Sequence, residues 1–576
     1  MLHLVLEQRV RLAVAAVLPD ANTDHLTVRP CPDPKFGDYQ TAALMSLARE
    51  RKLNPRQLAS DVVARLQVGD VCEPPEIAGA GFINFRLKPA ALLSVLEGAA
   101  QGGPLFFRPA ERPRTIVIDF SSPNVAKPMH VGHIRSTILG DCLTRTLRLL
   151  GHRVITDNHV GDWGTQFGML LHHVRSSHPH AGTDSVQFRI QDLEAFYKEA
   201  KRRFDEDPAF AEASRAAVVA LQSGDREAVR LWEIFCRESL RHCEEIYARL
   251  GVKFDHTLGE SFYNARLKPV VEELRARGLA RESEGALAVF FDDIPQLKDH
   301  PAIVQKSDGG FNYMTTDLAT LSYRLETWQP DEIVYVTDGR QQAHFQQLFA
   351  IFRRWQPERQ VRLAHVWFGM VLGEDGRPFK TRSGENIKLS ALLDEAEERA
   401  FRIVTEKNPD LPEAARREVA RVVGIGAVKY ADLLPNRQSD YVFSWDKMLA
   451  LNGNTAPYIL YAYARIRSIF RKLEPPALAA GPAGPFTLSR PEEFTLGKHL
   501  LHFGLVLEAV AEEYRPNYLC NYLYELAGHF ARFFETCPVL KAEGAERTSR
   551  LALCDLTARV LRQGLEALGI QTLEQM

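Results

Sequence analysis

Residues 115–156 have the pattern of a strand, a loop rich in proline and glycine, a helix and a second strand, in that order. Residues 115–120 are short, apolar and rich in β-branched side chains, which is typical of a buried parallel strand. Apolar residues recur at helical spacing between 134 and 147, so a helix is predicted to start near Gly132. Residues 153–156 are the next strand. The order predicts a βαβ unit, and open α/β sheets bind ligands at the carboxyl ends of strands, where the loop 121–133 lies.

Composition limits the remaining possibilities. A chain of 576 residues should divide into about three or four domains. Its net charge of −2 gives no global basic signal, so nucleic-acid binding would need a local basic face. The eight cysteines are scattered without a C-x-x-C pair, which predicts a reducing compartment and no structural metal. No apolar run approaches transmembrane length, and Arg9 and Arg11 favour an amphipathic first helix over a signal sequence. We therefore expect a cytoplasmic protein that does not associate with membranes.

Residues 1–108 are predicted to form a small α+β domain of their own. Within it, Asn54-Pro55 has the pattern of a helix N-cap with proline at the first helical position, and residues 81–87 alternate as a strand. A basic stretch lies near this cap, and it could be either a solvated helix face or a contact with an RNA backbone. Its members are Arg49, Arg51, Lys52 and Arg56.

The α/β pattern is interrupted once and then gives way to helices. We predict a Rossmann-like parallel-sheet domain with a first half at 109–173 and a second half at 301–390, separated by a mainly helical insert at 174–300. The loop 377–384 combines glycines, a proline and cations, as phosphate-binding loops do. Helices are predicted for 391–450 and, as an all-α bundle, for 451–576. The fold class is therefore multidomain α/β.

One predicted helix of the bundle, at about 454–472, combines aromatic and basic side chains. Core packing and a base-stacking, phosphate-binding face are equally compatible with this pattern. The residues concerned are Tyr458, Tyr461, Tyr463, Arg465, Arg467 and Arg471.

His130 and His133 flank Gly132 at the predicted start of the helix. Two histidines at this spacing could bind a metal, but no third ligand with suitable spacing is present. They could also be buried structural histidines. Nucleotide binding is favoured, because a helix N-terminus offers amide donors to phosphate and imidazoles add donors for a pentavalent phosphate. Glycine between them lets a flat base approach the backbone, and a lysine in a distant loop would complete a clamp on pyrophosphate.

The segment from Phe120 to His133, which ends in His-Val-Gly-His, resembles the HIGH signature of class I aminoacyl-tRNA synthetases in the form found in the arginyl-tRNA synthetase family. A lone H-x-G-H would be a weak signal, but further similar motifs follow in order and cover nearly the whole chain. These are 161–168, 313–317, 336–338 with Gln341 and His344, 379–384, 452–458 and 568–570.

This resemblance implies ATP-dependent activation of L-arginine to arginyl-adenylate, followed by transfer to the terminal adenosine of arginine tRNA. It also implies that activation needs bound tRNA, that ATP arrives with Mg²⁺, and that no editing domain is present. The domain at 1–108 would bind the tRNA elbow, 391–450 would contact the tRNA stem, and 451–576 would bind the anticodon. We expect a monomer rather than a dimer.

The resemblance further implies roles for individual residues. His130, Gly132 and His133 would face ATP and its transition state. In the KMSKS-like loop the usual second lysine falls on Thr381, and Lys127 is implied as its substitute. Phosphate contacts are therefore expected from Lys127, Lys380 and Arg382, with Lys127 joining the two histidines as catalytic residues.

The implied arginine pocket has two ends. Asp119 and Asn124 would surround the α-amino group, and Tyr313, Asp317 and Gln341 would form the rest. A desolvated carboxylate at Asp317 can accept two hydrogen bonds from a guanidinium, so lysine or citrulline should fit poorly. Further candidate pocket residues are His159, Asp162 and Gln166; candidate tRNA contacts are Asn454, Tyr458, Arg465 and Arg467.

Three alternatives were weighed against this interpretation. Another class I synthetase would need features that are missing here: a cysteine zinc site for cysteine, or a larger editing insert and apolar pocket for leucine, isoleucine or valine. A small-molecule nucleotidyltransferase would leave the residues before the sheet and the aromatic, basic bundle unused. A catalytically dead tRNA-binding paralogue would not need both histidines, Lys127 and the pocket residues.

Overall fold

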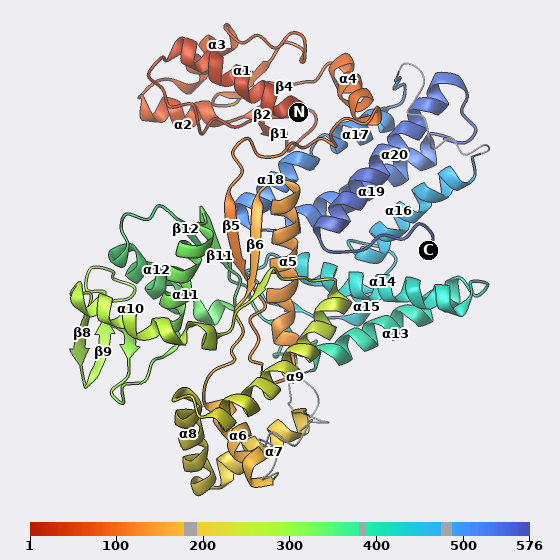
Figure 1. The fold of residues 1–576 in the computed structure, drawn as a ribbon. Helices are drawn as coiled ribbons and strands as arrows, with labels where there is room; N and C mark the ends of the chain where they lie inside the picture. The colour runs from red at the N-terminus through yellow and green to blue at the C-terminus, as the bar shows by residue number, and fades with distance from the viewer. Residues whose placement is uncertain (126, 178–192, 380–386, 474–485) are drawn as a thin grey trace.

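A five-stranded parallel sheet in the order β12-β11-β5-β6-β7 lies at the centre of the computed structural model (Figure 1). The structure describes residues 1–125, 127–177, 193–379, 387–473 and 486–576. The sheet order reverses between β5 and β11, and ligands of doubly wound sheets bind at this kind of switch point. The strands are β5 (Thr115–Asp119), β6 (Arg153–Asn158), β7 (His256–Thr257), β11 (Glu332–Tyr335) and β12 (Arg362–His365).

The helix predicted to follow the signature loop is confirmed. A short 3₁₀ turn, η1 (Val131–His133), leads into α5 (Ile134–Leu149), which joins β5 to β6. The helix lies close to the strand end, because a Cβ atom on Gly140 would stand only 2.2 Å from the ring of Phe120. On the other side of the switch point, α11 (Tyr313–Trp328) and α12 (Gln342–Trp355) lead into β11 and β12 respectively.

The insert is mainly helical. After α6 (Thr165–Ser177) it contains α7 (Leu193–Glu206), α8 (Pro208–Gln222) and α9 (Arg226–Leu250). Beyond Leu250 it also contains short strands, which the sequence pattern did not indicate. There, β7 joins the parallel sheet, and α10 (Asn264–Ala276) precedes a separate antiparallel sheet of β8 (Ala280–Ser283), β9 (Ala286–Val289) and β10 (Ala302–Gln305). Strands of two to four residues are too short to leave a periodic signal.

The N-terminal α+β domain is confirmed. Its antiparallel sheet has the order β1-β2-β4-β3. The N-cap prediction also holds, since the Asn54 side chain accepts from the backbone amides of Arg56 and Gln57 at 3.0 and 3.1 Å. The elements are α1 (Leu2–Val17), β1 (Arg29–Pro30), β2 (Tyr39–Thr41), α2 (Ala43–Glu50), α3 (Pro55–Val63), β3 (Glu76–Ala78), β4 (Phe82–Phe85) and α4 (Pro89–Ala100).

The remainder of the chain is almost entirely helical, as expected. The hairpin of α13 (Leu389–Lys407) and α14 (Glu413–Leu433) is followed by α15 (Trp445–Met448) and the bundle, with the short parallel pair β13 (Val371–Leu372) and β14 (Tyr441–Val442) beside the hairpin. The bundle helices are α16 (Ala456–Arg471), α17 (Pro491–Leu500), α18 (Phe503–Glu513), α19 (Asn517–Thr536) and α20 (Gly544–Ala567). Two helices of the bundle, α17 and α18, are separated by a turn at Leu501-His502.

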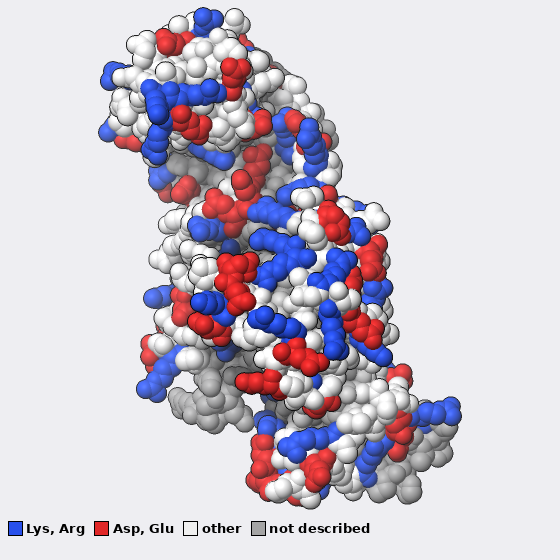
Figure 2. All heavy atoms as spheres, turned by 90° about the vertical axis from the view of Figure 1, so that its left-hand side faces the viewer, with Lys and Arg blue, Asp and Glu red and all other residues white. Residues whose placement is uncertain are grey.

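One continuous apolar core joins the N-terminal domain, α5 and the bundle, so these parts pack as one body (Figure 1). Lysine, arginine, aspartate and glutamate side chains are interspersed over the face shown in Figure 2, in keeping with the small net charge. Among the helices that the structure describes, none is both long and apolar enough to span a membrane.

Candidate active site

The loop that leaves β5 is held in a conformation that few side chains adopt. Ser121 and Ser122 have φ angles of 70° and 46°, in the left-handed region. The backbone amides of both serines donate to side chains, Ser121 to the Ser136 hydroxyl at 2.8 Å and Ser122 to Asn158 at 3.0 Å. The Ser121 hydroxyl is also 2.8 Å from the hydroxyl of Tyr247 on α9. Strain of this kind is found where the surroundings impose it, commonly at functional sites.

The two signature histidines form a reciprocal cap at the start of the helix. The Nδ1 atom of His130 accepts from the Gly132 amide, and the Nδ1 atom of His133 accepts from the His130 amide, both at 3.1 Å. Burial lowers the pKa of His130, with Lys127 as a second cause, and burial lowers the pKa of His133 to about 4. Both imidazoles are therefore neutral at pH 7. Since each Nδ1 accepts, each Nε2 carries the proton and is the donor left for a ligand.

The residues that follow the KMSKS-like loop are hydrogen-bonded to the signature segment, and the residue before the loop packs on Phe443. Val131 donates its amide to Ile387, and Leu389 donates to Met129, at 2.9 and 3.0 Å. Before the loop, Phe379 stacks on Phe443 with ring centroids 4.7 Å apart. The predicted phosphate contacts Lys380 and Arg382 lie outside the described residues.

Lys127 follows the strained loop directly and is exposed. Its ammonium lies 5.3 Å from the ring centroid of Tyr197 on α7, a cation–π arrangement. Its positive charge contributes to the lowered pKa of both histidines. The structure therefore brings this cation to the signature histidines, where the resemblance had implied a phosphate contact.

The guanidinium end of the predicted pocket is organised around Asp317. The first turn of α11 puts Asp317 and Tyr313 on one face, as expected, because both contact His344 of α12. His344 Nε2 lies 2.5 Å from the Asp317 carboxylate, and the Tyr313 and His344 rings are 5.1 Å apart. On the opposite side, His159 Nε2 is 4.0 Å from the other oxygen of Asp317. Asp317 thus remains one-fifth exposed between two imidazoles.

Two more carboxyl groups stand near Asp317. Glu260 begins the 3₁₀ turn η2 (Glu260–Tyr263), and burial, together with the charges of Asp317 and Asp162, raises its pKa to about 8. Asp162 accepts from the Ser261 amide and hydroxyl at 2.9 and 2.6 Å, and burial raises its pKa as well. A carboxyl group whose pKa is raised by burial and by acidic neighbours can ionise when a cation arrives. Glu260 was not predicted, because it lies in the segment assigned to the insert.

A second pair of acidic residues lies at the carboxyl ends of β5 and β6. Asp119 and Asp157 are register partners on these parallel strands, and both are buried. The wholly buried Arg324 of α11 lies between them and donates to Asp119 at 2.6 Å and to Asp157 at 2.9 Å. Asp119 also accepts from the Ser122 hydroxyl at 2.8 Å. Asp119 was predicted; its partner Arg324 was not.

Other predicted pocket residues are placed less tightly. Asn124 lies beside Gly161, where a Cβ atom would stand 2.2 Å from the Asn124 amide oxygen, so the signature loop can approach the segment 161–168 this closely only because position 161 is glycine. Gln166 is half-buried in the first turn of α6. Gln341 ends the turn η3 (Gly339–Gln341) with an exposed side chain, one helical turn before His344.

The predicted RNA contacts of the bundle differ in how much they are already engaged. The Asn454 side chain bonds to Tyr430 and Asn521, at 2.5 and 3.0 Å. Arg467 pairs with Glu574 of the C-terminal tail at 2.7 Å. Tyr458 packs 5.6 Å from Tyr524, and Arg465 lies 4.5 Å from the ring of Phe534. The aromatic side chains of α16 therefore take part in packing, and Arg465 has no carboxylate partner among the described residues, while the phosphate-binding face stays a prediction.

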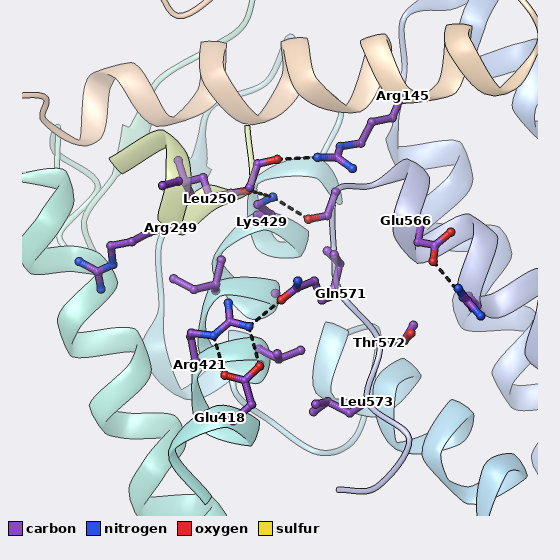
Figure 3. Close-up of a pocket in the computed structure, with 18 of the residues that line it drawn as sticks. Arg145, Arg249, Leu250, Glu418, Arg421, Lys429, Glu566, Gln571, Thr572 and Leu573 are labelled. Atoms are coloured by element: carbon purple, nitrogen blue, oxygen red, sulfur yellow. Dashed lines mark hydrogen bonds and ion pairs between the residues drawn. The ribbon is translucent and has the colours of Figure 1, made fainter. Parts of the chain in front are cut away.

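A cavity of about 500 Å³ lies apart from all of these residues, where α5, α14, α20 and the tail meet (Figure 3). The buried Lys429 ammonium donates there to the carbonyls of Leu250 and Gly569, at the ends of α9 and α20. Arg421 pairs with Glu418 and Arg562 with Glu566. These cations are thus already paired within the protein, and the cavity lies at a junction between domains.

Comparison with known proteins first defines the class. Residues 103–445 match the family model described as tRNA synthetases class I (R), catalytic domain. Residues 4–87 match the arginyl tRNA synthetase N terminal domain, and residues 459–576 match the DALR anticodon binding domain. The fold and the signature site are thus those of a class I aminoacyl-tRNA synthetase, a class that uses ATP.

The comparisons also define the family within this class. An arginine–tRNA ligase of Chromobacterium violaceum is 48% identical over 582 residues, covering 100% of both chains. The crystal structure of arginyl-tRNA synthetase from Plasmodium falciparum is similar with a TM-score of 0.86 and 28% identity, covering 100% of this chain and 99% of that one. The Thermus thermophilus arginyl-tRNA synthetase is similar with a TM-score of 0.83 and 27% identity, covering 100% of both chains. The chain belongs to the arginyl-tRNA synthetase family, which confirms the resemblance.

Proposed function

We propose that this chain activates L-arginine with ATP and transfers it to arginine tRNA, and that activation needs the bound tRNA. In the first step a carboxylate oxygen of arginine attacks the α-phosphorus of ATP and pyrophosphate leaves. In the second step a hydroxyl of the terminal adenosine attacks the carbonyl carbon of arginyl-adenylate and AMP leaves. Family membership and the arginine–tRNA ligase relatives support this reaction.

Two clusters of acidic side chains support the choice of substrate. One is Asp119 with Asp157 around Arg324, and the other is Asp317 with Glu260 and Asp162. L-Arginine has two cationic ends, an α-ammonium and a guanidinium, which these two groups match. The planar guanidinium can donate to two carboxylates at once. Lysine would offer a compact ammonium without this fork, and citrulline would bring no charge, so both would leave buried carboxyl groups unpaired.

The phosphate end is supported by the signature. The Nε2–H groups of His130 and His133 have no hydrogen-bond partner among the described residues and are proposed to donate to phosphate oxygens; such donors gain strength as negative charge builds in the transition state. The Lys127 ammonium is proposed to hold pyrophosphate, with Lys380 and Arg382 as further contacts. Mg²⁺ is proposed to arrive with ATP, where it would offset phosphate charge. Among the described residues no group of three or more His, Cys, Asp or Glu side chains could hold a metal ion, so its ligands would be mainly phosphate oxygens and water.

The predicted domain roles stay proposals. Residues 1–108 are proposed to bind the tRNA elbow, residues 391–450 the stem and residues 451–576 the anticodon. The catalytic domain is proposed to comprise residues 109–173 and 301–390, with the insert at 174–300 between its two halves. The matched N-terminal and anticodon-binding family models support the first and last of these roles. We further propose a monomer in the cytoplasm; the eight cysteines are all free thiols, which suits a reducing compartment.

Pyrophosphate exchange tests the proposal. The chain is incubated with ATP, labelled pyrophosphate and each amino acid in turn, with and without arginine tRNA. Exchange is expected with arginine alone among the amino acids, and only when the tRNA is present. Exchange without tRNA would refute the requirement for tRNA, and exchange driven by a different amino acid would refute the assignment of the pocket.

A further inference from the structure

We propose that Arg324 is a positioning residue for the α-ammonium group of the substrate, acting through Asp119. This inference rests on the proposed function, in which Asp119 accepts that ammonium. Arg324 lies on the fourth turn of α11 and touches no part of the pocket surface, since its side chain is fully buried. Its effect on the substrate would therefore pass entirely through the carboxylate that it holds.

The geometry fixes Asp119 from two sides. Arg324 Nη2 donates to Oδ2 of Asp119 at 2.6 Å, and the Ser122 hydroxyl donates to Oδ1 at 2.8 Å. Arg324 also donates twice to Asp157, from Nε at 3.1 Å and from Nη2 at 2.9 Å. One donor on each oxygen of Asp119 sets the plane of this carboxylate and leaves lone pairs on both oxygens for a third donor. A carboxylate held in this way needs no reorganisation when an ammonium arrives.

Arg324 also determines the charge that the ammonium meets. Asp119 and Asp157 occupy directly paired positions on adjacent parallel strands. Two buried carboxylates at this spacing repel each other, and a cation between them offsets that repulsion. Burial already raises the pKa of Asp157, while the charge of Arg324 opposes that shift. With Arg324 present the three groups carry one net negative charge, which a single ammonium neutralises.

A role in stability alone explains this arrangement poorly. Buried ion pairs often contribute little to stability, because desolvation offsets their attraction. The Arg324 Nη1 atom and the Asp157 Oδ1 atom are both buried without a hydrogen-bond partner among the described residues. Unpaired buried polar atoms are costly, so the arrangement is not optimised as a stabilising network. Its location directly beneath the substrate-facing carboxylate is better explained by function.

Substrate analogues can separate positioning from general support. 5-Guanidinopentanoate keeps the guanidinium and the carboxylate of arginine but lacks the α-amino group, so it cannot contact Asp119 as an ammonium does. In the complete aminoacylation assay with arginine tRNA, Arg324→Met should raise the KM for L-arginine about tenfold or more, as expected when a charge-assisted hydrogen bond is lost. The inhibition constant of 5-guanidinopentanoate should change less than about twofold, and Arg324→Lys should recover part of the loss.

A buried arginine elsewhere in the chain provides the control. Arg550→Met is suited to it, because the Arg550 side chain is also buried and pairs with Glu493 at 2.7 Å in the bundle. This control should leave unchanged the ratio of the KM for L-arginine to the inhibition constant of 5-guanidinopentanoate.

The outcomes are distinguishable. If Arg324→Met and Arg324→Lys weaken L-arginine and 5-guanidinopentanoate equally, Arg324 only supports the fold and the inference is overturned. Asp119→Asn tests whether Asp119 itself binds the α-ammonium group. If Asp119→Asn weakens L-arginine selectively but the Arg324 variants do not, this inference alone fails. If Asp119→Asn has no selective effect, the proposed role of Asp119 fails as well.

Discussion

Glu260 should make arginine binding depend on pH, and the size of the effect follows from its pKa. In the free protein burial and two neighbouring carboxyl groups raise this pKa to about 8. At pH 7 only about one-tenth of the molecules then carry the Glu260 carboxylate. A guanidinium beside Glu260 favours the charged form, so binding releases a proton below pH 8. Affinity for arginine should therefore rise with pH, about tenfold from pH 6 to 7 and about fivefold from 7 to 8, and level off above that.

Calorimetry measures this directly. L-Arginine is titrated into the chain with arginine tRNA present, at pH 6, 7 and 8, in buffers of different ionisation enthalpy, which count the protons released. The unmodified chain should release close to one proton at pH 7, whereas Glu260→Gln should release none from this position and bind arginine with little dependence on pH. Equal proton release by both proteins, or a flat profile in the unmodified chain, would refute the reasoning. His133, with a pKa of about 4, does not titrate in this range and so does not confuse the result.

The remaining predictions concern the other parts of the site. Asp317→Asn should reduce discrimination of arginine over citrulline by roughly 2–5 kcal/mol in kcat/KM, since it unpairs a partly buried charge; an unchanged ratio would remove Asp317 from the pocket. Lys127→Met should lower kcat for arginine activation with little change in the KM for arginine, whereas Tyr197→Phe, which keeps the ring beneath the ammonium, serves as its control. Arg465→Glu should weaken tRNA binding and lower its salt dependence more than Arg467→Glu, because Arg467 is already paired with Glu574; equal effects in filter-binding titrations would contradict this order.

Local patterns in the sequence were sufficient to predict the signature loop and its helix. The apolar period of α5 and the strand before it depend on neighbours within a few residues, as does the N-cap at Asn54. The position of Asp317 one turn after Tyr313 is likewise a property of a single helix. These features were predicted because each depends on short-range geometry.

Features that depend on contacts between distant segments were not predicted. β7 is a two-residue strand, recognisable only once it pairs with β6. Glu260 follows it and therefore appeared to belong to a helical insert. Arg324 lies 205 residues from Asp119 and looks like an ordinary charged position of an amphipathic helix. The pairing of Arg467 with Glu574 spans 107 residues, so the basic face of α16 appeared more available than it is.

Charging of a mixed tRNA pool tests the central claim most directly. Total tRNA is deacylated and incubated with the purified chain, ATP and each labelled amino acid in separate reactions, and the charged tRNAs are then sequenced. The account predicts that arginine alone is attached and that only arginine isoacceptors are charged. Attachment of any other amino acid, charging of a non-arginine tRNA, or no charging with arginine would contradict it.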